Sequence, residues 1–516
     1  MTDAANWHVQ AAWHYHQATK HSPESVRRST YQLDWSNYPL PFKIYRNLPA
    51  ERLPTTWQTS HLPALQAICN DGSRFRPDAI LDRAALARLL YFSAGVQRVR
   101  QYGEMTVPYR AAACTGNLHH IELYLACGKL PDLDPGIYHF GPHDFSLRLL
   151  RAGDHRRYLA EATASHPDVV RAPVVLVATS MFWRNAWKYQ ARAYRHAFWD
   201  CGTILANLFA LAAATELRHR LVLGFVDEEV NRLLAIDGRR EAALALIALG
   251  ESASEPPSPP PLRTLAPEVE PVSPREVEFP EIPRMHAASS LRSANEVRRW
   301  YRARLAPLAP PPSPTPSAAQ RALPPAPVAA EPIEAVILRR GSTRRFSRTS
   351  ISLPTFAAVL RAAATRIPAD FQQGGPLTDV YSIVHAVEGL ESGAYALPRT
   401  EPNLHLLQPG SFRSLAGHLA LGQALAADAA ANVYSLADLH RILPAYGNRG
   451  YRAAQLEGGI AGGKMYLTAF AQRIGATGLT FFDDEVTQFF SPHAAGKSVM
   501  FLTAVGMPHR RPAKAT

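Results

Sequence analysis

The sequence has few cysteines, and they are scattered. Its 516 residues include four, with no CxxC spacing among them. This pattern excludes a zinc ribbon and a dense disulfide framework. We therefore expect reduced thiols in a cytoplasmic protein. The cysteines are Cys69, Cys114, Cys127 and Cys201.

Long apolar runs and a secretory leader are also missing. No apolar stretch reaches the roughly 20 residues needed to span a bilayer. The opening segment, residues 1–6, has neither the basic region nor the apolar region of a signal peptide. We therefore expect no membrane contact and no export.

The sequence lacks a basic block, although its formal net charge is +12. The positive residues are mostly arginines spread along the chain, without a Lys/Arg run and without interleaved aromatic residues. A nucleic-acid interface usually concentrates its charge on one stripe or face, so we expect no nucleic-acid partner. The excess charge favours anionic ligands only weakly.

Apolar residues, by contrast, are plentiful enough for a large core. They make up 47% of a chain whose length is typical of two domains. Residues 174–179 form a continuous β-branched run, which predicts a buried central strand. Residues 204–214 are apolar on nearly every side, which predicts a buried helix. The aromatic- and proline-rich residues 1–65 are expected to lie on the folded body as an extended lead-in.

Proline separates two parts of the chain. The clusters at residues 256–261 and 310–314 cannot enter a helix or sheet interior. They bracket a short segment, 294–305, with a possible helical pattern. We interpret residues 251–332 as a largely disordered linker, with a partner-binding polyproline motif as the alternative.

The part after the linker repeats the part before it. Residues 194–202 align with 451–459, and residues 133–138 align with 390–395. In both halves, 58 residues separate the glycine of the second patch from the Tyr-Arg pair of the first. Matched patches in the same order predict an internal duplication. The predicted boundaries are a lead-in at 1–65, a first domain at 66–250, a linker at 251–332 and a second domain at 333–516.

One basic segment belongs to the second half alone. Arg340, Ser342 and Arg344 alternate, so an extended segment would turn them to one face. Guanidinium groups and hydroxyls suit phosphate oxygens, and a solvated basic turn is the alternative. Aligning the two halves on Phe75 and Phe346 places no arginine at the equivalent positions of the first half. Those positions hold Cys69, Asp71 and Ser73.

In each half, one acidic patch lies at the start of a predicted helix. Residues 227–229 and 483–485 are interpreted as helix N-terminal acids, because negative charge is favourable there. We therefore predict no metal site. A histidine pair, His119 and His120, could line a cleft or simply lie on the polar surface.

Together these segments resemble the FMN-dependent nitroreductase superfamily, and within it the SagB/ThcOx-type azoline dehydrogenases. The basic segment resembles the superfamily's flavin-phosphate signature. Other segments resemble the family's lead-in, its Gly and Glu-x-Tyr segment, its Lys-Tyr stretch and its flavin-side loop. In order, they are residues 15–35, 115–124, 187–195 and 478–484. The Lys-Tyr pair becomes Ala445-Tyr446 in the second half, and Cys114-Thr115 replace the usual Pro-Ser.

This resemblance implies an α+β fold in which two nitroreductase-like units, each a mixed sheet flanked by helices, form an internal pseudo-dimer. It implies FMN in the cleft between them. The phosphate contacts would be Arg340, Ser342, Arg344 and Arg510. The ring contacts would be Gly478 and Leu479 from the second half and Thr115, Gly116 and Asn117 from the first. The catalytic pair would be Lys188, with a pKa lowered by burial or by nearby arginines, and Tyr189.

The activity implied is oxidation of thiazoline or oxazoline rings to azoles in a peptide or small-molecule natural product. A cyclodehydratase or another maturation protein would be the partner, and the pseudo-dimer could oligomerise further. One alternative is an NAD(P)H-dependent nitro or quinone reductase. The other is a flavin-free, peptide-binding pseudoenzyme.

Overall fold

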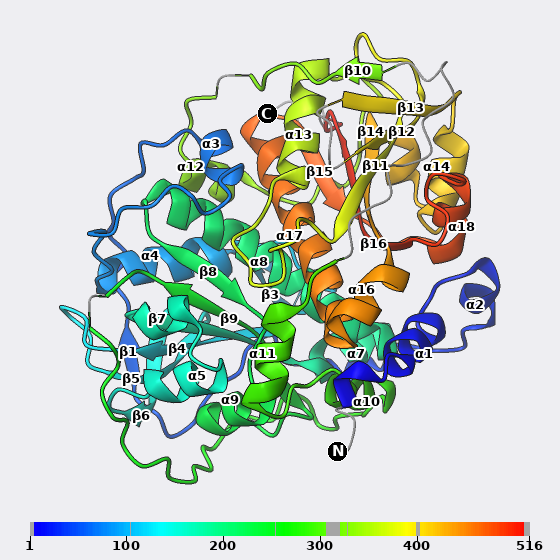
Figure 1. Ribbon diagram of the computed structural model, residues 1–516. Helices are drawn as coiled ribbons and strands as arrows, with labels where there is room; N and C mark the ends of the chain where they lie inside the picture. The colour runs from blue at the N-terminus through cyan, green and yellow to red at the C-terminus, as the bar shows by residue number, and fades with distance from the viewer. Residues whose placement is uncertain are drawn as a thin grey trace.

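Two seven-stranded sheets with the same strand order form the frame of the protein (Figure 1). The computed structural model describes residues 5–103, 105–252, 254–305, 320–327, 329–398 and 403–509. The first sheet has the order β1-β6-β5-β4-β7-β9-β8, and the second has β10-β13-β12-β11-β14-β16-β15. Neighbouring strands of the central ladders, such as β4 and β7 or β11 and β14, run antiparallel. The matching orders confirm the predicted duplication and the α+β class.

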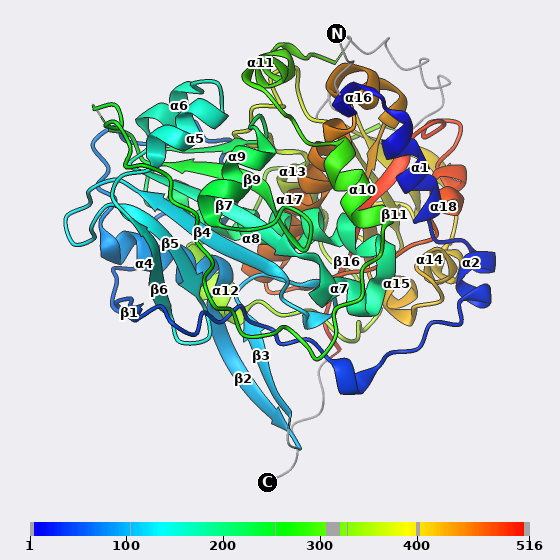
Figure 2. The ribbon, with the colours of Figure 1, turned by 90° about the horizontal axis from the view of Figure 1, so that it is seen from below.

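The first sheet consists of β1 (Ala50–Arg52), β4 (Ile121–Cys127), β5 (Gly136–Gly141), β6 (Ser146–Ala152), β7 (Val174–Met181), β8 (His219–Val222) and β9 (Glu241–Leu249). The second consists of β10 (Gln320–Ala322), β11 (Thr378–Val384), β12 (Gly393–Leu397), β13 (Asn403–Pro409), β14 (Ala431–Ala437), β15 (Gly475–Gly478) and β16 (Ser498–Gly506). A separate hairpin, β2 (Val96–Tyr102) and β3 (Met105–Arg110), projects from the body (Figure 2).

Two long helices, α8 (Ala193–Ala214) and α17 (Arg449–Ala471), pack against each other between the sheets (Figure 1). They meet at the glycines that the repeat aligns, since a Cβ atom on Gly202 would lie 2.5 Å from the carbonyl carbon of Gly459. Backbones can approach this closely only where side chains are absent. Among the described residues, one helical stretch is long and apolar enough to cross a membrane, Phe182–Ala214, and 94% of its apolar 18-residue window is buried within the protein. That burial is the environment of a core helix.

The other helices also occur in matched pairs. Helix α4 (Arg83–Ala94) corresponds to α13 (Leu353–Ala364), and each begins at a residue whose side chain accepts a backbone N–H, Asp82 or Ser352. Helices α3 (Ala64–Ile68) and α12 (Ile333–Arg339) precede them. The remaining helices are α2 (Pro23–Arg28), α5 (Arg156–Ala162), α6 (Pro167–Arg171), α7 (Phe182–Tyr189), α9 (Asp227–Leu234), α14 (Arg413–Leu419), α15 (Ala424–Asp428), α16 (Leu439–Tyr446) and α18 (Asp483–Phe489).

The segment interpreted as a linker contains two packed helices, α10 (Glu281–Ala288) and α11 (Ala294–Arg302). Ser293 caps α11, and Val297 and Trp300 are buried at helical spacing. A short amphipathic helix therefore forms between the proline clusters, as the pattern at 294–305 predicted. The interpretation as a largely disordered linker is wrong for this stretch, because these apolar side chains cover the folded body.

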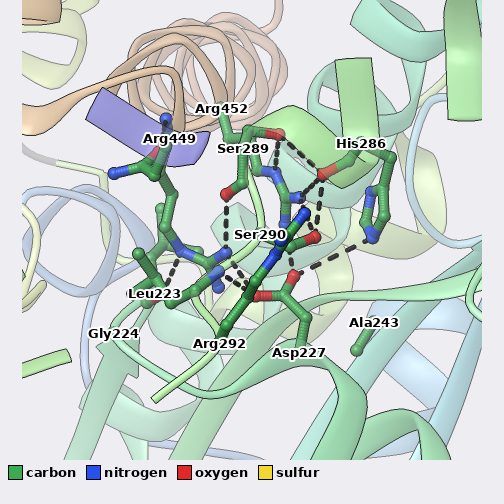
Figure 3. Close-up of polar contacts among 12 residues, drawn as sticks. Leu223, Gly224, Asp227, Ala243, His286, Ser289, Ser290, Arg292, Arg449 and Arg452 are labelled. Carbon is green, nitrogen blue, oxygen red and sulfur yellow. Dashed lines mark hydrogen bonds and ion pairs between the residues drawn. The ribbon is translucent and has the colours of Figure 1, made fainter. Parts of the chain in front are cut away.

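Two buried ionic clusters join the halves. Asp227, the first residue of α9, accepts hydrogen bonds from Arg449 (2.7 Å) and Arg452 (2.8 Å) of α17 (Figure 3). The carbonyls of His286 and Ser289, which belong to α10 and the residue after it, accept from the same two arginines. The acids at residues 227 and 483 thus lie at helix N-termini, as predicted, and also hold cations of the opposite half. No group of side chains that could hold a metal ion occurs among the described residues.

In the second cluster the two halves exchange roles. The second half supplies the carboxylate, and the first half supplies the arginines. Asp483 accepts from Arg192 (3.0 Å), the residue before α8, and from Arg195 of α8 (2.6 Å). The lead-in supplies the carbonyls here, from Thr19 and from His16 of α1 (Gln10–Ala18). Residues 16–21 and 286–291 therefore play the same part on opposite sides. The lead-in is itself duplicated.

Candidate functional site

Arg340 of the predicted phosphate set joins the two halves. It follows α12 directly, and its Nε donates to the carbonyl of Ala111 at 2.8 Å while Nη2 donates to that of Arg110 at 3.3 Å. Burial lowers the pKa of Arg340 to about 10. Two of its donors are thus occupied by the backbone of the first half. The phosphate role of Arg340 stays a prediction, and the sequence could not reveal these carbonyl partners.

Ser342 and Arg344 remain available. The Ser342 hydroxyl lies 3.3 Å from the phenol oxygen of Tyr466, which also accepts the backbone N–H of Gly478 at 2.5 Å. Arg344 is exposed, and its guanidinium forms no hydrogen bond or ion pair within the described part of the chain. The basic segment and the predicted ring-side loop therefore lie side by side through Tyr466.

The projecting hairpin adds arginines that the sequence analysis missed. Arg98 donates to the carbonyl of Arg340 at 2.9 Å. The pKa of Tyr102 is lowered by the hydrogen bond with Tyr109 and, to a smaller degree, by Arg100 and Arg344. Arg344 therefore faces this hairpin. The alternation in Arg98-Val99-Arg100 was the available signal, because an exposed strand turns such residues to one side.

The loop of the first half around residues 114–120 is held by one buried carboxylate. Asp200 of α8 accepts from the backbone N–H of Thr115 (2.9 Å), from its hydroxyl (2.7 Å) and from the thiol of Cys114 (3.2 Å). His120 lies 2.9 Å from the same carboxylate through Nε2. Asp200 lies in the repeated segment 194–202, where the second half has Glu457. Its contacts make it the residue that positions the loop.

The loop has an unusual backbone. Gly116, Asn117 and His119 all have positive φ, at 66°, 59° and 44°. Such conformations cost free energy in non-glycine residues and cluster at functional sites. A Cβ atom on Gly116 would lie 3.0 Å from the phenol oxygen of Tyr189. The structure thus brings the predicted Tyr189 directly onto the predicted loop.

Lys188 differs from the prediction. It is exposed at the end of α7, with its ammonium 5.4 Å from the centre of the Tyr189 ring. The arginines expected to perturb it are occupied, Arg184 by Glu122 and Arg192 by Asp483. The expectation that Lys188 is buried is therefore wrong. Burial instead raises the pKa of Tyr189, with Asp200 adding to the shift.

A row of aromatic side chains connects the two sides of the site. Tyr189 packs on His196 at 4.6 Å between ring centres, and His196 packs on Trp199 at 4.9 Å. Trp199 lies 5.6 Å from Phe501, and a Cβ atom on Gly478 would lie 3.4 Å from the Phe501 ring. The first-half loop and the second-half loop thus share one apolar wall.

Two further expectations can be placed. Leu479 donates its N–H to the carbonyl of Leu502 and is partly buried beside Phe346. Arg510 lies outside the described residues. The histidine pair is not on the surface, because His119 is 5% exposed and His120 is fully buried.

These residues fit FMN. Ser342 and the unpaired Arg344 offer donors for a phosphate, and the arginines of the hairpin add positive charge. Glycines at residues 116 and 478 permit a flat ring to approach the backbone closely. The aromatic wall supplies apolar surface between them. The site draws on both halves.

Comparisons with known proteins agree with this fold. The family model described as "Nitroreductase family" matches residues 74–251 and 337–506. The chain therefore belongs to the nitroreductase family, whose members are oxidoreductases and generally use flavin cofactors. A search of curated proteins gave no match.

The matching solved structures include one that covers nearly the whole chain. A putative nitroreductase from Anabaena variabilis is 26% identical over 97% of this chain and 99% of its own, with a TM-score of 0.76. A putative nitroreductase from Ralstonia eutropha is 20% identical over 42% of this chain and 100% of its own (TM-score 0.31). The E. coli microcin synthetase McbBCD complex matches at 17% identity over 48% of this chain and 93% of that chain (TM-score 0.31). The two partial matches are too weak to inform the chemistry.

Proposed function

We propose that the protein is an FMN-dependent dehydrogenase that oxidises thiazoline or oxazoline rings to azoles in a peptide natural product. The observation that carries the flavin part is the asymmetry between the halves. Arg344 is exposed beside Ser342 and makes no hydrogen bond or ion pair with the residues that the structure describes, whereas the equivalent positions of the first half hold Asp71 and Ser73. One phosphate site per chain follows from this difference.

Support for the ring-oxidising activity comes from the sequence segments that resemble azoline dehydrogenases, above all the Lys188-Tyr189 stretch. Tyr189 contacts Gly116 of the loop and continues into the aromatic wall. These contacts support the proposal that the stretch lies beside the flavin ring. Peptide substrate and a cyclodehydratase partner belong to this proposal.

Bound FMN would supply a hydride acceptor, and the protein must supply orientation and a proton acceptor. Because burial raises the pKa of Tyr189, its phenol keeps its proton and is suited to donate a hydrogen bond to the substrate. Lys188 is the proposed proton acceptor. Its ammonium is exposed at the end of α7, beside the Tyr189 ring.

The test uses the purified chain reconstituted with FMN and an azoline-containing peptide. We expect oxygen-dependent formation of azole, which Lys188→Ala abolishes without loss of bound flavin. Lys129→Ala, which removes another exposed lysine, is the matched control and should retain full turnover. Rapid bleaching of the flavin by NADPH, with no azole formed, would overturn the dehydrogenase in favour of a reductase.

A further inference from the structure

A second cavity lies between the halves, away from the proposed flavin site. Its volume is about 330 Å³, within the range of small-ligand pockets. Cys69 of the first half and Arg361, Thr378 and Lys464 of the second half line it, and most other lining side chains are apolar. The cavity is therefore an apolar space with a few polar groups at its wall.

Lys464 brings a buried ammonium to this cavity, with no direct ion pair among the described residues. It belongs to α17, is 2% exposed, and its ammonium has one hydrogen-bond acceptor among the described residues, the carbonyl of Arg366 at 3.5 Å. An ammonium needs up to three acceptors, and burying it without an anion is unfavourable. A group that supplies negative charge beside Lys464 would be stabilised there.

The nearest carboxylate on the same helix cannot supply that charge. Glu457 accepts from the side-chain amide of Gln372 (2.5 Å), the N–H of Leu377 (2.8 Å) and both the N–H and hydroxyl of Thr378 (each 2.7 Å). It forms no ion pair with Lys464 in the described structure. Its oxygens are already satisfied, so it acts on the loop at residues 372–378 as Asp200 acts on the opposite loop.

The equivalent position in the other half holds a larger side chain. Cys69 follows α3 as Arg340 follows α12, so the two residues occupy equivalent positions. The cavity that adjoins Arg110 on the Arg340 side is only about 10 Å³. A thiol thus stands beside the larger cavity at the position where the other half has a long guanidinium.

A second exchange accounts for the charge. By the same repeat, Lys464 occupies the position of Asn207, whose side-chain amide donates to the carbonyl of Phe92 at 2.9 Å. One half therefore has a neutral, bonded amide where the other has a buried ammonium. The larger cavity and the buried ammonium therefore occur together, at only one of the two equivalent positions.

We propose that this cavity binds a small organic monoanion, a carboxylate with an apolar body, whose charged group pairs with Lys464. The apolar lining suits the body of such a ligand. A phosphate is disfavoured, because Asp71 stands where the second half has Ser342, and a hydrogen bond from Ser73 lowers the pKa of Asp71 and keeps it ionised. The site is distinct from the flavin site and does not depend on the proposed activity.

The groups facing Lys464 set a pH dependence. They are Cys69 and Asp71 from the first half, Glu457 on the same helix and Arg361, whose guanidinium is bonded to the carbonyls of Leu323 and Pro324. Burial lowers the pKa of Lys464 to about 8. The ammonium form binds an anion and is lost as pH rises through that value. Affinity for a carboxylate should therefore be about tenfold or more higher at pH 7 than at pH 9.5.

The experiment is calorimetric titration of the full chain with sodium hexanoate, hexanol and inorganic phosphate. We expect hexanoate to bind one site per chain, and Lys464→Met to weaken that binding at least tenfold. Lys129→Met, which removes an exposed lysine, should leave it unchanged. Hexanol and phosphate should bind at least tenfold more weakly than hexanoate.

Several outcomes would overturn the proposal. They are absence of hexanoate binding at millimolar concentration, equal binding by Lys464→Met, equal binding of hexanol, or equal affinity at pH 7 and pH 9.5. Lys464→Met removes an unpaired buried charge and should fold at least as stably as the wild type. A cavity-filling variant, Ala461→Phe, provides a second test, because it should abolish hexanoate binding while leaving Lys464 in place.

Discussion

Replacing Asp227 by alanine should separate the structural role of the buried clusters from any catalytic role. The Asp227 carboxylate is 2.7 Å from Nη1 of Arg449 and 2.8 Å from Nη1 of Arg452, and both arginine side chains are fully buried. Removing the anion leaves two guanidinium charges in the interface between the halves. Breaking a single buried pair typically costs about 3–5 kcal/mol. We expect Asp227→Ala to lose at least that much stability.

The loss should appear as a lower thermal unfolding midpoint. For a cooperative unit of 150–250 residues, about 3–5 kcal/mol corresponds to a decrease of roughly 6–20 °C. Circular dichroism of the wild type, Asp227→Ala and the matched control Glu228→Ala measures it. Glu228 is the exposed neighbour on the same helix, so its variant should unfold within about 2 °C of the wild type.

The pH dependence gives the same prediction a second readout. Burial alone would raise the pKa of Asp227, but Arg449 and Arg452 more than offset burial and hold it below the ordinary value. The stabilisation is therefore complete above about pH 4, the pKa of an unfolded aspartate, and is lost as the pH falls further. Asp227→Ala should lose less stability on acidification than the wild type. An Asp227→Ala midpoint within about 2 °C of the wild type would refute the reasoning.

Three further predictions follow from the repeat. Gly202→Leu should destabilise by at least about 1–3 kcal/mol, because its side chain has no room against Gly459; chemical denaturation measures this, with Gly341→Ala, which meets no atom within 4 Å, as the control. Asp200→Asn should weaken FMN affinity roughly tenfold by releasing Thr115, and Glu457→Gln at the equivalent position should not, as measured by fluorescence titration. Asp483→Ala should lower the unfolding midpoint about as much as Asp227→Ala, because Arg192 and Arg195 repeat the second-half arginines; an unchanged midpoint would mean that the two clusters are not equivalent.

The sequence predicts the frame well because the frame is periodic. The run at residues 174–179 is part of β7, and the apolar stretch at 204–214 is the end of α8. Aligning Gly202 with Gly459 anticipated the point at which the long helices cross. Side-chain periodicity predicts local structure, and small residues predict close helix contacts. Both signals can be found within a single segment of the sequence.

The site could be predicted only in part. Alternation identified the basic segment, but it could not reveal that Arg340 would meet carbonyls at residues 110 and 111, which depend on how the halves dock. The expected burial of Lys188 was wrong for a similar reason, since the exposure of a side chain is decided by neighbouring elements. The cavity beside Cys69 and Lys464 is likewise an outcome of two exchanges far apart in the sequence.

The most direct test of the account is the number of FMN molecules bound per chain. We expect one FMN per chain in the wild type after reconstitution and desalting, measured by absorbance against protein concentration. Arg344→Ala should retain less than about a tenth of the FMN bound by the wild type. The substitution removes the charged guanidinium proposed to donate hydrogen bonds to the phosphate. The exposed neighbour variant Arg345→Ala should still retain one. Two flavins per chain, none, or full retention by Arg344→Ala would contradict a single phosphate site built by the second half.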